Sequence, residues 1–302
     1  MIKPNVGVIG LGAMGMGVAR SLLRAGFTVA ACDVREEARA AIEAAGGTAY
    51  ATPAEVGKSS AIVITLVVNA EQTDSVLFGP GGAVETLAPG SAVIASATVP
   101  PEFAIALEQR LAERGLLLLD APVSGGAAKA AQGQMTVMAS GPAAVFAKVR
   151  PVLDAIAAKV YELGDAAGPG STAKMVNQLL AGVHIAAAAE AMALGIRAGA
   201  DPVQLFEVIS NSAGSSWMFQ NRVPHILAGD YTPLSAVNIF VKDLGLVSDA
   251  ARKLMFPVPL TAAALQMFVA ASAAGHGAED DSAVIKAYAK LTGIALPPAK
   301  DA

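Results

Sequence analysis

The feature that most constrains the fold of this chain is a G-x-G-x-x-G motif placed directly after an apolar strand. Residues 6–9, Val-Gly-Val-Ile, lead into Gly10, Gly12 and Gly15. In such a motif the first glycine permits a tight turn, the second lets the backbone approach a pyrophosphate, and the third lets a helix pack closely on the strand. The helix that begins there offers its free N–H groups and its positive dipole end to phosphates. The motif therefore predicts a strand–turn–helix unit that binds a phosphate-bearing ligand.

An aspartate at the end of the second predicted strand indicates which ligand this is. After a helical stretch at 18–26, the apolar segment 27–32 ends at Asp33, about twenty residues beyond the motif. A carboxylate at this place accepts hydrogen bonds from ribose hydroxyls and repels a 2′-phosphate, so we expect NAD rather than NADP. Arg35 is expected to be a solvated residue at the start of the next helix. The predicted cofactor loop consists of Gly10, Leu11, Gly12, Ala13, Met14 and Gly15.

The composition of the chain argues against several classes of protein. Its 302 residues suffice for two domains, and 54% hydrophobic with 15% charged residues provides a large core. A net charge of −4 without a basic run argues against nucleic acid or an anionic membrane as a partner. The apolar stretches 179–196 and 254–275 are interrupted by charged residues or prolines, so neither predicts a membrane span. The single cysteine, Cys32, excludes an internal disulfide and favours the cytoplasm. The three histidines lack metal-ligand spacing, so no metal is expected.

The first half of the chain alternates strands with helices, as a parallel α/β sheet requires. Beyond residue 33, strands are predicted at 61–68, 92–95, 116–119, 135–139 and 160–163. Helices are predicted at 35–45, 74–77, 101–114 and 143–158. Together these segments indicate one doubly wound sheet of six or more strands.

The second half of the chain reads as helical throughout. Residues 171–198 would form one helix of roughly 40 Å, long enough to join two domains. Further helices are predicted at 201–210, 236–253, 261–274 and 282–291. We therefore expect a dinucleotide-binding domain at 1–165 and an all-helical substrate and oligomerisation domain at 166–302.

Residues 120–126, D-A-P-V-S-G-G, follow a predicted strand and form a second candidate ligand site. Ser124, Gly125 and Gly126 can present a hydroxyl and successive N–H groups to an anion at the carboxyl end of the sheet. An ordinary turn is equally compatible with this spacing.

A third candidate lies at the head of the long helix. Lys174 and Asn177 are three residues apart and share one face. A lysine there could act as a general acid or base if partly desolvated, although most helical lysines are solvated surface residues. Residues 240–244, F-V-K-D-L, read by themselves as a plain helix segment.

Taken together, these motifs resemble the β-hydroxyacid dehydrogenase family, which includes 3-hydroxyisobutyrate and 6-phosphogluconate dehydrogenases. The resemblance covers nearly the whole chain, through residues 10–15, 120–126, 170–177 and 242–244. It implies a Rossmann-type domain, a helical second domain and oxidation of a small hydroxy acid with NAD. By analogy of fold it also implies a homodimer or homotetramer formed through the helical domain.

The resemblance implies roles for individual residues. Lys174 would be the catalytic acid/base, and Asn177 would bond to the substrate hydroxyl or to Lys174. The residues implied at the substrate are Ser124, Gly125, Gly126 and Phe240. Those implied at the cofactor, besides the glycine loop and Asp33, are Val67, Val68, Thr98 and Lys242. The chain departs from the family where Ala95-Ser96-Ala97-Thr98 replaces the frequent Asp-x-Ser-Thr, and where Gln178 replaces a frequent second Asn.

A closer similarity, in residues 67–72 and 215–222, is to the branch of the family that oxidises L-threonate. Oxidation at C2 would yield 2-oxo-tetronate. Because unpaired buried polar groups are costly, the extra hydroxyls of this substrate need partners, and Asn69, Gln72 and Asn211 are the candidates. Trp217 in the second segment is equally well explained as a packed core aromatic.

Other functions remain open at this point. The same residues would serve a 3-hydroxyisobutyrate dehydrogenase, or a reductase that acts on tartronate semialdehyde, succinic semialdehyde or glyoxylate. A non-catalytic dinucleotide-binding module is the alternative from another class. Such a module would be expected to have lost Lys174 or Asn177, and both are present.

Overall fold

The computed structural model describes residues 3–299 and divides into two compact units. One unit, here the N-terminal unit, extends to Lys174, and the other, the helical unit, begins at Met175. The strands of the N-terminal unit are β1 (Val6–Ile9), β2 (Val29–Cys32), β3 (Thr48–Tyr50), β4 (Ile62–Thr65), β5 (Ala92–Ala95), β6 (Leu117–Asp120), β7 (Val123–Ser124), β8 (Met135–Ala139) and β9 (Ala157–Glu162). Its helices are α1 (Ala13–Arg24), α2 (Glu36–Ala44), α3 (Pro53–Ser59), α4 (Ala70–Phe78), the 3₁₀ turn η1 (Ala83–Glu85), α5 (Pro101–Ala112), α6 (Gly126–Gln132) and α7 (Ala143–Ile156). Helix α8 (Pro169–Arg197) begins in this unit and continues into the next.

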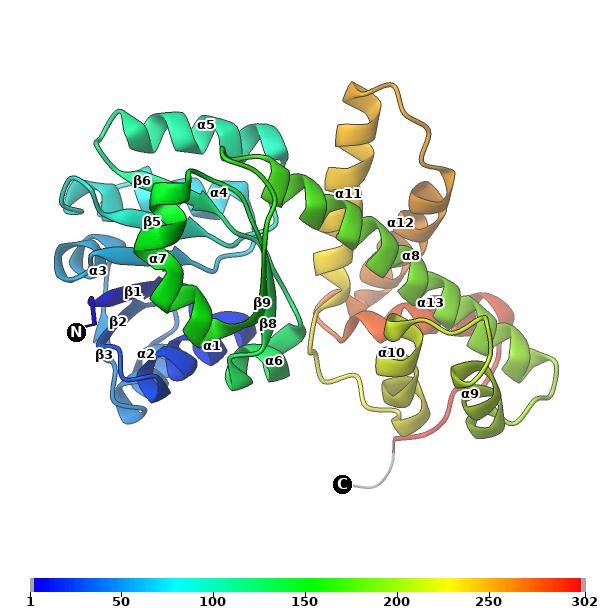
Figure 1. Ribbon diagram of the computed structural model, residues 1–302. Coiled ribbons are helices and arrows are strands. Elements are labelled where there is room, and N and C mark those ends of the chain that lie inside the picture. Colours follow the sequence, from blue (N-terminus) through cyan, green and yellow to red (C-terminus); the bar gives the residue numbers. More distant parts are fainter. Residues whose placement is uncertain (1–2, 300–302) are drawn as a thin grey trace. The chain divides into compact units, whose positions relative to one another are not determined.

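The main sheet of the N-terminal unit is parallel and doubly wound (Figure 1). Its strand order is β3-β2-β1-β4-β5-β6, and all five pairs of neighbours are parallel. The order reverses between β1 and β4, which is the point where such sheets bind ligands. The predicted fold class is confirmed.

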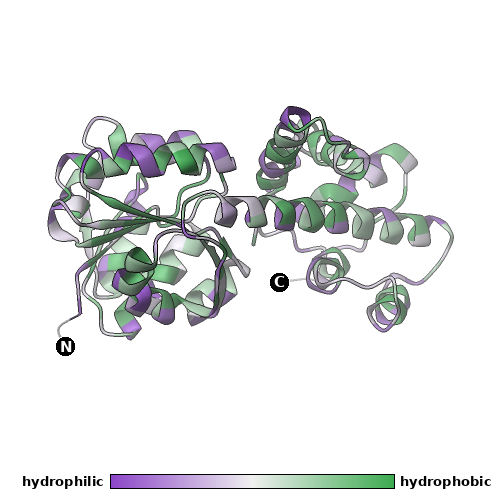
Figure 2. Ribbon diagram, turned by 45° about the horizontal axis from the view of Figure 1, so that its top comes forward, coloured by the Kyte–Doolittle hydropathy of each residue, from purple (hydrophilic) through white to green (hydrophobic). Residues whose placement is uncertain are grey.

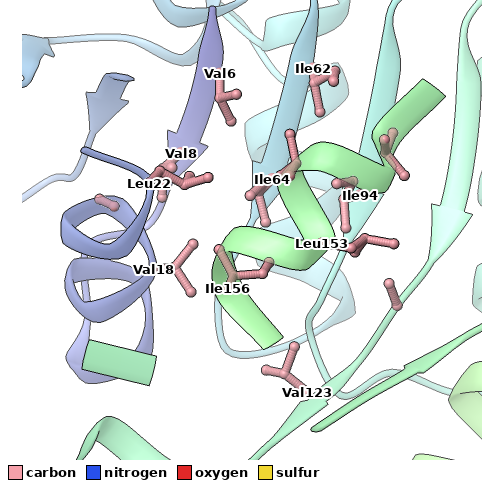
Figure 3. Packing of buried hydrophobic residues seen from close by; sticks show 14 of the residues in the cluster. Val6, Val8, Val18, Leu22, Ile62, Ile64, Ile94, Val123, Leu153 and Ile156 are labelled. Carbon is pink, nitrogen blue, oxygen red and sulfur yellow. The ribbon is translucent and has the colours of Figure 1, made fainter. Parts of the chain in front are cut away.

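Side chains of the central strands are buried on both faces of this sheet. On one face Val8, Ile64 and Ile94 pack against α1 and α7 (Figure 3). On the other face Val63 and Val93 join a second cluster with α3, α4 and α5. Because each fully buried aliphatic side chain contributes about 1.5–3 kcal/mol, the two cores hold the strands in register.

One part of the predicted sheet is wrong. The strands expected at 135–139 and 160–163 form a separate sheet of order β7-β8-β9, in which β7 and β8 are antiparallel. A further parallel neighbour would need a crossover of a dozen or more residues, whereas β7 begins three residues after β6 ends. The sixth strand of the main sheet is instead β3, which is too short and too exposed to show a hydrophobic period.

The helical unit contains no strand among its described residues, as predicted for this half of the chain. Besides the remainder of α8 it comprises α9 (Pro202–Ser210), α10 (Trp217–Ala228), α11 (Val237–Lys253), α12 (Pro259–Ala271), the π-helical turn η2 (Ser272–His276), the 3₁₀ turn η3 (Asp281–Val284) and α13 (Ile285–Thr292). Its core includes the stacked rings of Phe240 and Phe268, whose centroids are 5.3 Å apart. Trp217 lies outside that core with 56% of its surface exposed, so the interpretation as a packed core aromatic is wrong.

Helix α8 is hydrophobic along most of its length (Figure 2). By length and composition alone it could cross a membrane, a property that it shares with core helices of water-soluble proteins. The buried residues of α8 are not all apolar, because Lys174 and Gln178 are among them. The single cysteine, Cys32, is buried in β2 as a free thiol.

Candidate active site

The carboxyl ends of four neighbouring strands lie in register at one edge of the main sheet. Ile9 of β1 pairs with Cys32 of β2 and with Thr65 of β4, and Thr65 pairs with Ala95 of β5. The segments that follow these strands therefore start side by side. They contain the glycine loop, Asp33, Val67 with Val68, and Thr98, in that order along the chain.

The geometry of the glycine loop fits a pyrophosphate. Gly10 has φ +93°, and a Cβ at this position would lie 2.7 Å from the carbonyl oxygen of Leu66. A Cβ at Gly15 would lie 1.8 Å from the carbonyl oxygen of Gly10, so only glycine allows α1 to approach the turn so closely. At Gly12, by contrast, a Cβ would meet open space, and this residue caps α1 without a side chain. The N-terminal N–H groups of α1 are thus accessible to an anion.

Asp33 lies beside this loop and is tied to it. Its Oδ2 accepts a 2.7 Å hydrogen bond from the backbone N–H of Leu11, and its Oδ1 accepts 2.9 and 3.0 Å bonds from the backbone and Nε of Arg35. Burial opposes ionisation of Asp33, but the hydrogen bonds from Arg35 and Leu11 outweigh it and lower the pKa of the carboxyl. Arg35 is exposed at the start of α2, as expected, and its half-exposed guanidinium also pairs with Asp33. The residues present therefore fit a dinucleotide, with a charged carboxylate near the loop.

A buried network joins the end of β6 to the first turn of α8. Asp120 is 1% exposed, and its Oδ2 accepts hydrogen bonds from the backbone N–H groups of Gly168 and Ser171 at 3.0 and 2.9 Å. Its Oδ1 accepts a 2.7 Å bond from the Ser171 hydroxyl. The hydroxyl of Ser140 completes the network: it donates to Asp120 at 3.3 Å and accepts the N–H of Gly170 at 2.9 Å. Burial is the largest influence on Asp120 and raises its pKa.

Lys174 lies one turn beyond this anchored segment. Its surface is only 7% exposed, so the alternative of a solvated surface lysine is wrong. A lysine held in a buried position on a helix is the kind of residue that can exchange a proton with a positioned substrate.

The loop after β7 presents the predicted anion-binding residues. Ser124 ends β7, and α6 begins at Gly126. Gly125 and Gly126 have φ +133° and +72°, conformations that residues with a Cβ rarely adopt. All three residues are at least partly exposed, so their polar groups are reachable by a ligand.

Two predicted site residues of the helical unit belong to one chain of hydrogen bonds. The amide of Asn177 donates to the Oε1 of Gln178 at 3.0 Å, and the Nε2 of Gln178 donates to the Oδ2 of Asp243 at 2.6 Å. The ammonium of Lys242 lies 2.5 Å from the other oxygen of this carboxylate. Asn177 and Lys242 are thereby linked through two buried side chains, Gln178 and Asp243, which were not among the predicted site residues.

The remaining predicted contacts are more dispersed. Val67 is half-buried, Val68 is 46% exposed and Thr98 is partly exposed. Phe240, by contrast, is 3% exposed and stacks on Phe268, so the structure places it in the helical core, and a role at the substrate stays a prediction.

The candidate partners for extra substrate hydroxyls are engaged locally. Asn69 caps α4 by accepting the N–H of Gln72, and Gln72 accepts the N–H of Val68. Asn211 donates to the carbonyl of Glu207 at the end of α9. Among residues 3–299, no group of three or more His, Cys, Asp or Glu side chains is arranged to hold a metal ion.

Of the site residues that were not predicted, some have a local signal in the sequence and others have none. The four-residue spacing of Lys174 and Gln178 could have placed both on one helix face. The partners of Asp120 lie 48 and 51 residues away, so no local pattern could have identified them.

Comparisons with known proteins agree with this geometry. The NAD-binding domain of 6-phosphogluconate dehydrogenase matches residues 5–164, and the NAD-binding family of NADP-dependent 3-hydroxyisobutyrate dehydrogenase matches residues 168–288. The chain is 66% identical to an L-threonate dehydrogenase of Cupriavidus necator over 97% of this chain and 98% of the relative. It is 53% identical to an L-threonate dehydrogenase of Pectobacterium atrosepticum over 98% of this chain and 97% of that one.

A solved structure extends the agreement to three dimensions. The crystal structure of 3-hydroxyisobutyrate dehydrogenase from Salmonella typhimurium aligns with a TM-score of 0.90 at 53% identity, covering 94% of this chain and 99% of that chain. The family resemblance found in the sequence, and NAD as the cofactor, are confirmed. The chain belongs to the β-hydroxyacid dehydrogenases, the NAD-binding oxidoreductases that include 6-phosphogluconate and 3-hydroxyisobutyrate dehydrogenases.

Proposed function

We propose that this enzyme oxidises L-threonate at C2 to 2-oxo-tetronate with NAD, and that Lys174 is its general acid/base. The observation that carries the proposal is the buried position of Lys174, one turn after the anchored start of α8. The choice of substrate is supported by the high identity to relatives named L-threonate dehydrogenase.

The chemistry divides between the cofactor and the side chains of this chain. Bound NAD supplies the hydride acceptor. Lys174, in its neutral form, takes the proton of the substrate hydroxyl and becomes an ammonium group as the carbonyl forms. In the reverse direction the same ammonium returns the proton.

Other residues bind and orient. Ser124 and the N–H groups of Gly125 and Gly126 would hold the substrate carboxylate, since the backbone there can present successive donors. Asn177 would donate to the substrate hydroxyl or to Lys174 from the same helix. Asp33 would bond to the adenosine ribose, and the glycine loop would hold the pyrophosphate.

The substrate is tested by following NADH formation with L-threonate, 3-hydroxyisobutyrate and glycerate, and NADH consumption with tartronate semialdehyde, succinic semialdehyde and glyoxylate. We expect the largest kcat/KM for L-threonate. A larger value for any other compound would replace it as the substrate while leaving the family assignment in place.

The role of Lys174 is tested by Lys174→Ala. We expect kcat to fall roughly 10²–10⁴-fold, the usual contribution of a positioned acid/base, with NADH binding nearly unchanged. Lys148→Ala on α7 is the matched control, because this lysine is exposed and outside the site. A Lys174→Ala enzyme of nearly full activity would refute the assignment.

We further propose that the enzyme is a cytoplasmic homodimer or homotetramer. The helical unit exposes large apolar side chains that a second copy of the chain could cover, among them Leu194, Val203, Val208, Leu254 and Leu260. Sedimentation equilibrium measures the mass directly, and a monomer at micromolar concentration would contradict the proposal.

A further inference from the structure

The buried carboxylate of Asp120, at the end of β6, caps the first turn of helix α8. An α-helix leaves its first N–H groups without partners inside the helix, and they are usually capped by a nearby side chain. In α8, Pro169 has no N–H, and the next two donors, from Gly170 and Ser171, are accepted by Ser140 and Asp120. The start of α8 is therefore capped by residues of β6 and of the segment after β8.

The contact between this first turn and the strands is also close sterically. A Cβ at Gly170 would lie 2.6 Å from the carbonyl oxygen of Met138 and 2.7 Å from that of Asp120. Asp120 and Ser140 are themselves joined by two backbone hydrogen bonds, of 3.1 and 2.8 Å. The first turn of α8 thus rests on a rigid junction of two strand ends.

The helix transmits this constraint to the proposed acid/base. Ser171 and Lys174 are three residues apart, so they lie on the same face in successive turns. Both are buried, with 1% and 7% of their surfaces exposed. A displacement of the first turn would carry the amine of Lys174 with it, and displacements of about 1 Å can cost roughly 10²-fold in rate.

We infer that Asp120 is a positioning residue for catalysis: its carboxylate, bonded to Gly168 and Ser171, sets where Lys174 stands. The inference rests on the proposed role of Lys174. It assigns to Asp120 no contact with substrate or cofactor.

The decisive variants differ in how many hydrogen bonds they preserve. Asp120→Asn can still accept both N–H groups through its amide oxygen, and its NH₂ can donate to the Ser171 hydroxyl, which accepts as well as donates. Asp120→Ala removes every acceptor. Asp165→Ala is the matched control, because this exposed aspartate also lies shortly before α8.

We expect Asp120→Ala to lower kcat roughly 10–100-fold at a temperature well below its melting point. KM for the hydroxy acid and the dissociation constant of NADH should change by less than about threefold, because the ligand-binding groups remain. The isotope effect on kcat with substrate deuterated at the oxidised carbon should rise, as chemistry becomes slower than product release. Asp120→Asn should stay within about fivefold of the wild-type kcat, since its hydrogen bonds keep their geometry.

Two outcomes would overturn the inference. A folded Asp120→Ala enzyme with wild-type kcat and isotope effect would show that the carboxylate is structural only. A loss confined to NADH affinity would place Asp120 at the cofactor. If Asp120→Ala does not fold, Ser171→Ala takes its place, with an expected loss in kcat of roughly 3–10-fold, and an unchanged kcat there overturns the inference.

The experiment separates this inference from the function on which it rests. If Lys174→Ala keeps its activity, the proposed mechanism fails regardless of Asp120. If Lys174→Ala is inactive while folded Asp120→Ala is fully active, only the positioning role fails.

Discussion

Asp33 and Asp120 make an informative pair, because each ends or follows a strand of the same parallel sheet. Asp33 stands after β2 at the edge where the cofactor loop lies, and its partners are Leu11 and Arg35. Asp120 ends β6 and is 1% exposed, with no cationic partner among its hydrogen bonds. One carboxylate lies at the cofactor edge beside a half-exposed arginine, whereas the other is sealed inside the protein as an anchor.

The difference shows that the same local signal, an apolar strand that ends in aspartate, has two outcomes. What separates them is the segment that the fold brings against each carboxylate. A loop and a half-exposed arginine face Asp33, while the start of α8, where Ser171 is buried, covers Asp120. Three measurements test this contrast.

The two aspartates should differ most in what they contribute to stability. Asp120→Ala leaves buried N–H groups of Gly168 and Ser171 and two hydroxyls without their acceptor, so we expect a loss of about 3–5 kcal/mol in the free energy of unfolding. Asp33→Ala should cost only about 1–2 kcal/mol, because its partner Arg35 is half exposed and can be hydrated. Urea unfolding of the NAD-free proteins measures both, and equal losses would erase the distinction between anchor and recognition group.

The second effect is on cofactor affinity, where the Asp33 variant should lose more than the Asp120 variant. We expect Asp33→Ala to raise the dissociation constant of NAD roughly 10–100-fold, through the loss of charge-assisted bonds to the ribose. Asp120→Asn should leave this constant within about twofold. Titration calorimetry gives both values.

Arg35→Ala is the companion variant at the cofactor edge. It should lower the ratio of kcat/KM for NADP to kcat/KM for NAD by a few-fold, since a cation near Asp33 favours a 2′-phosphate.

The smallest effect is on the acid dependence of stability. Burial raises the pKa of Asp120, whereas at Asp33 burial is outweighed by hydrogen bonds that lower the pKa. A lowered pKa adds stability at pH values above the ordinary pKa of the carboxyl, and this gain is lost as the pH falls through the folded-state pKa. A raised pKa acts in the opposite sense: the folded state holds the proton more tightly, so stability is gained as the pH falls from the folded-state pKa to the ordinary one.

Comparison with the asparagine variants, which do not titrate, isolates these two contributions. Relative to Asp33→Asn the wild type should lose stability in acid, and relative to Asp120→Asn it should gain it. Urea unfolding between neutral and moderately acidic pH provides the curves. Slopes of the same sign for both variants would contradict the assigned pKa directions.

Much of the cofactor half was predictable because its signals are local. The glycine loop, the strand before it and Asp33 lie within one strand–helix–strand unit, and their spacing carries the geometry. The long helix was likewise evident from its composition. The separate sheet of β7, β8 and β9 was missed because periodicity indicates that a segment is extended but not which strand it pairs with.

The catalytic half was only partly predictable for the same reason. Lys174 was selected by motif, yet its burial could not be read from the sequence, and neither could the chain from Asn177 through Gln178 to Asp243, whose last link spans 65 residues. Phe240 was selected as a substrate residue, but the structure shows it stacked in a core.

The doubly wound class, the dinucleotide loop and the helical second half were all predictable from the amino-acid sequence, because glycine stereochemistry and hydrophobic period act over a few residues. Three further features became evident only in the folded molecule: Asp120 anchors α8, Arg35 pairs with Asp33, and Lys174 is buried. These depend on which distant segments share one space, and a buried polar group takes its meaning from the partners it finds there.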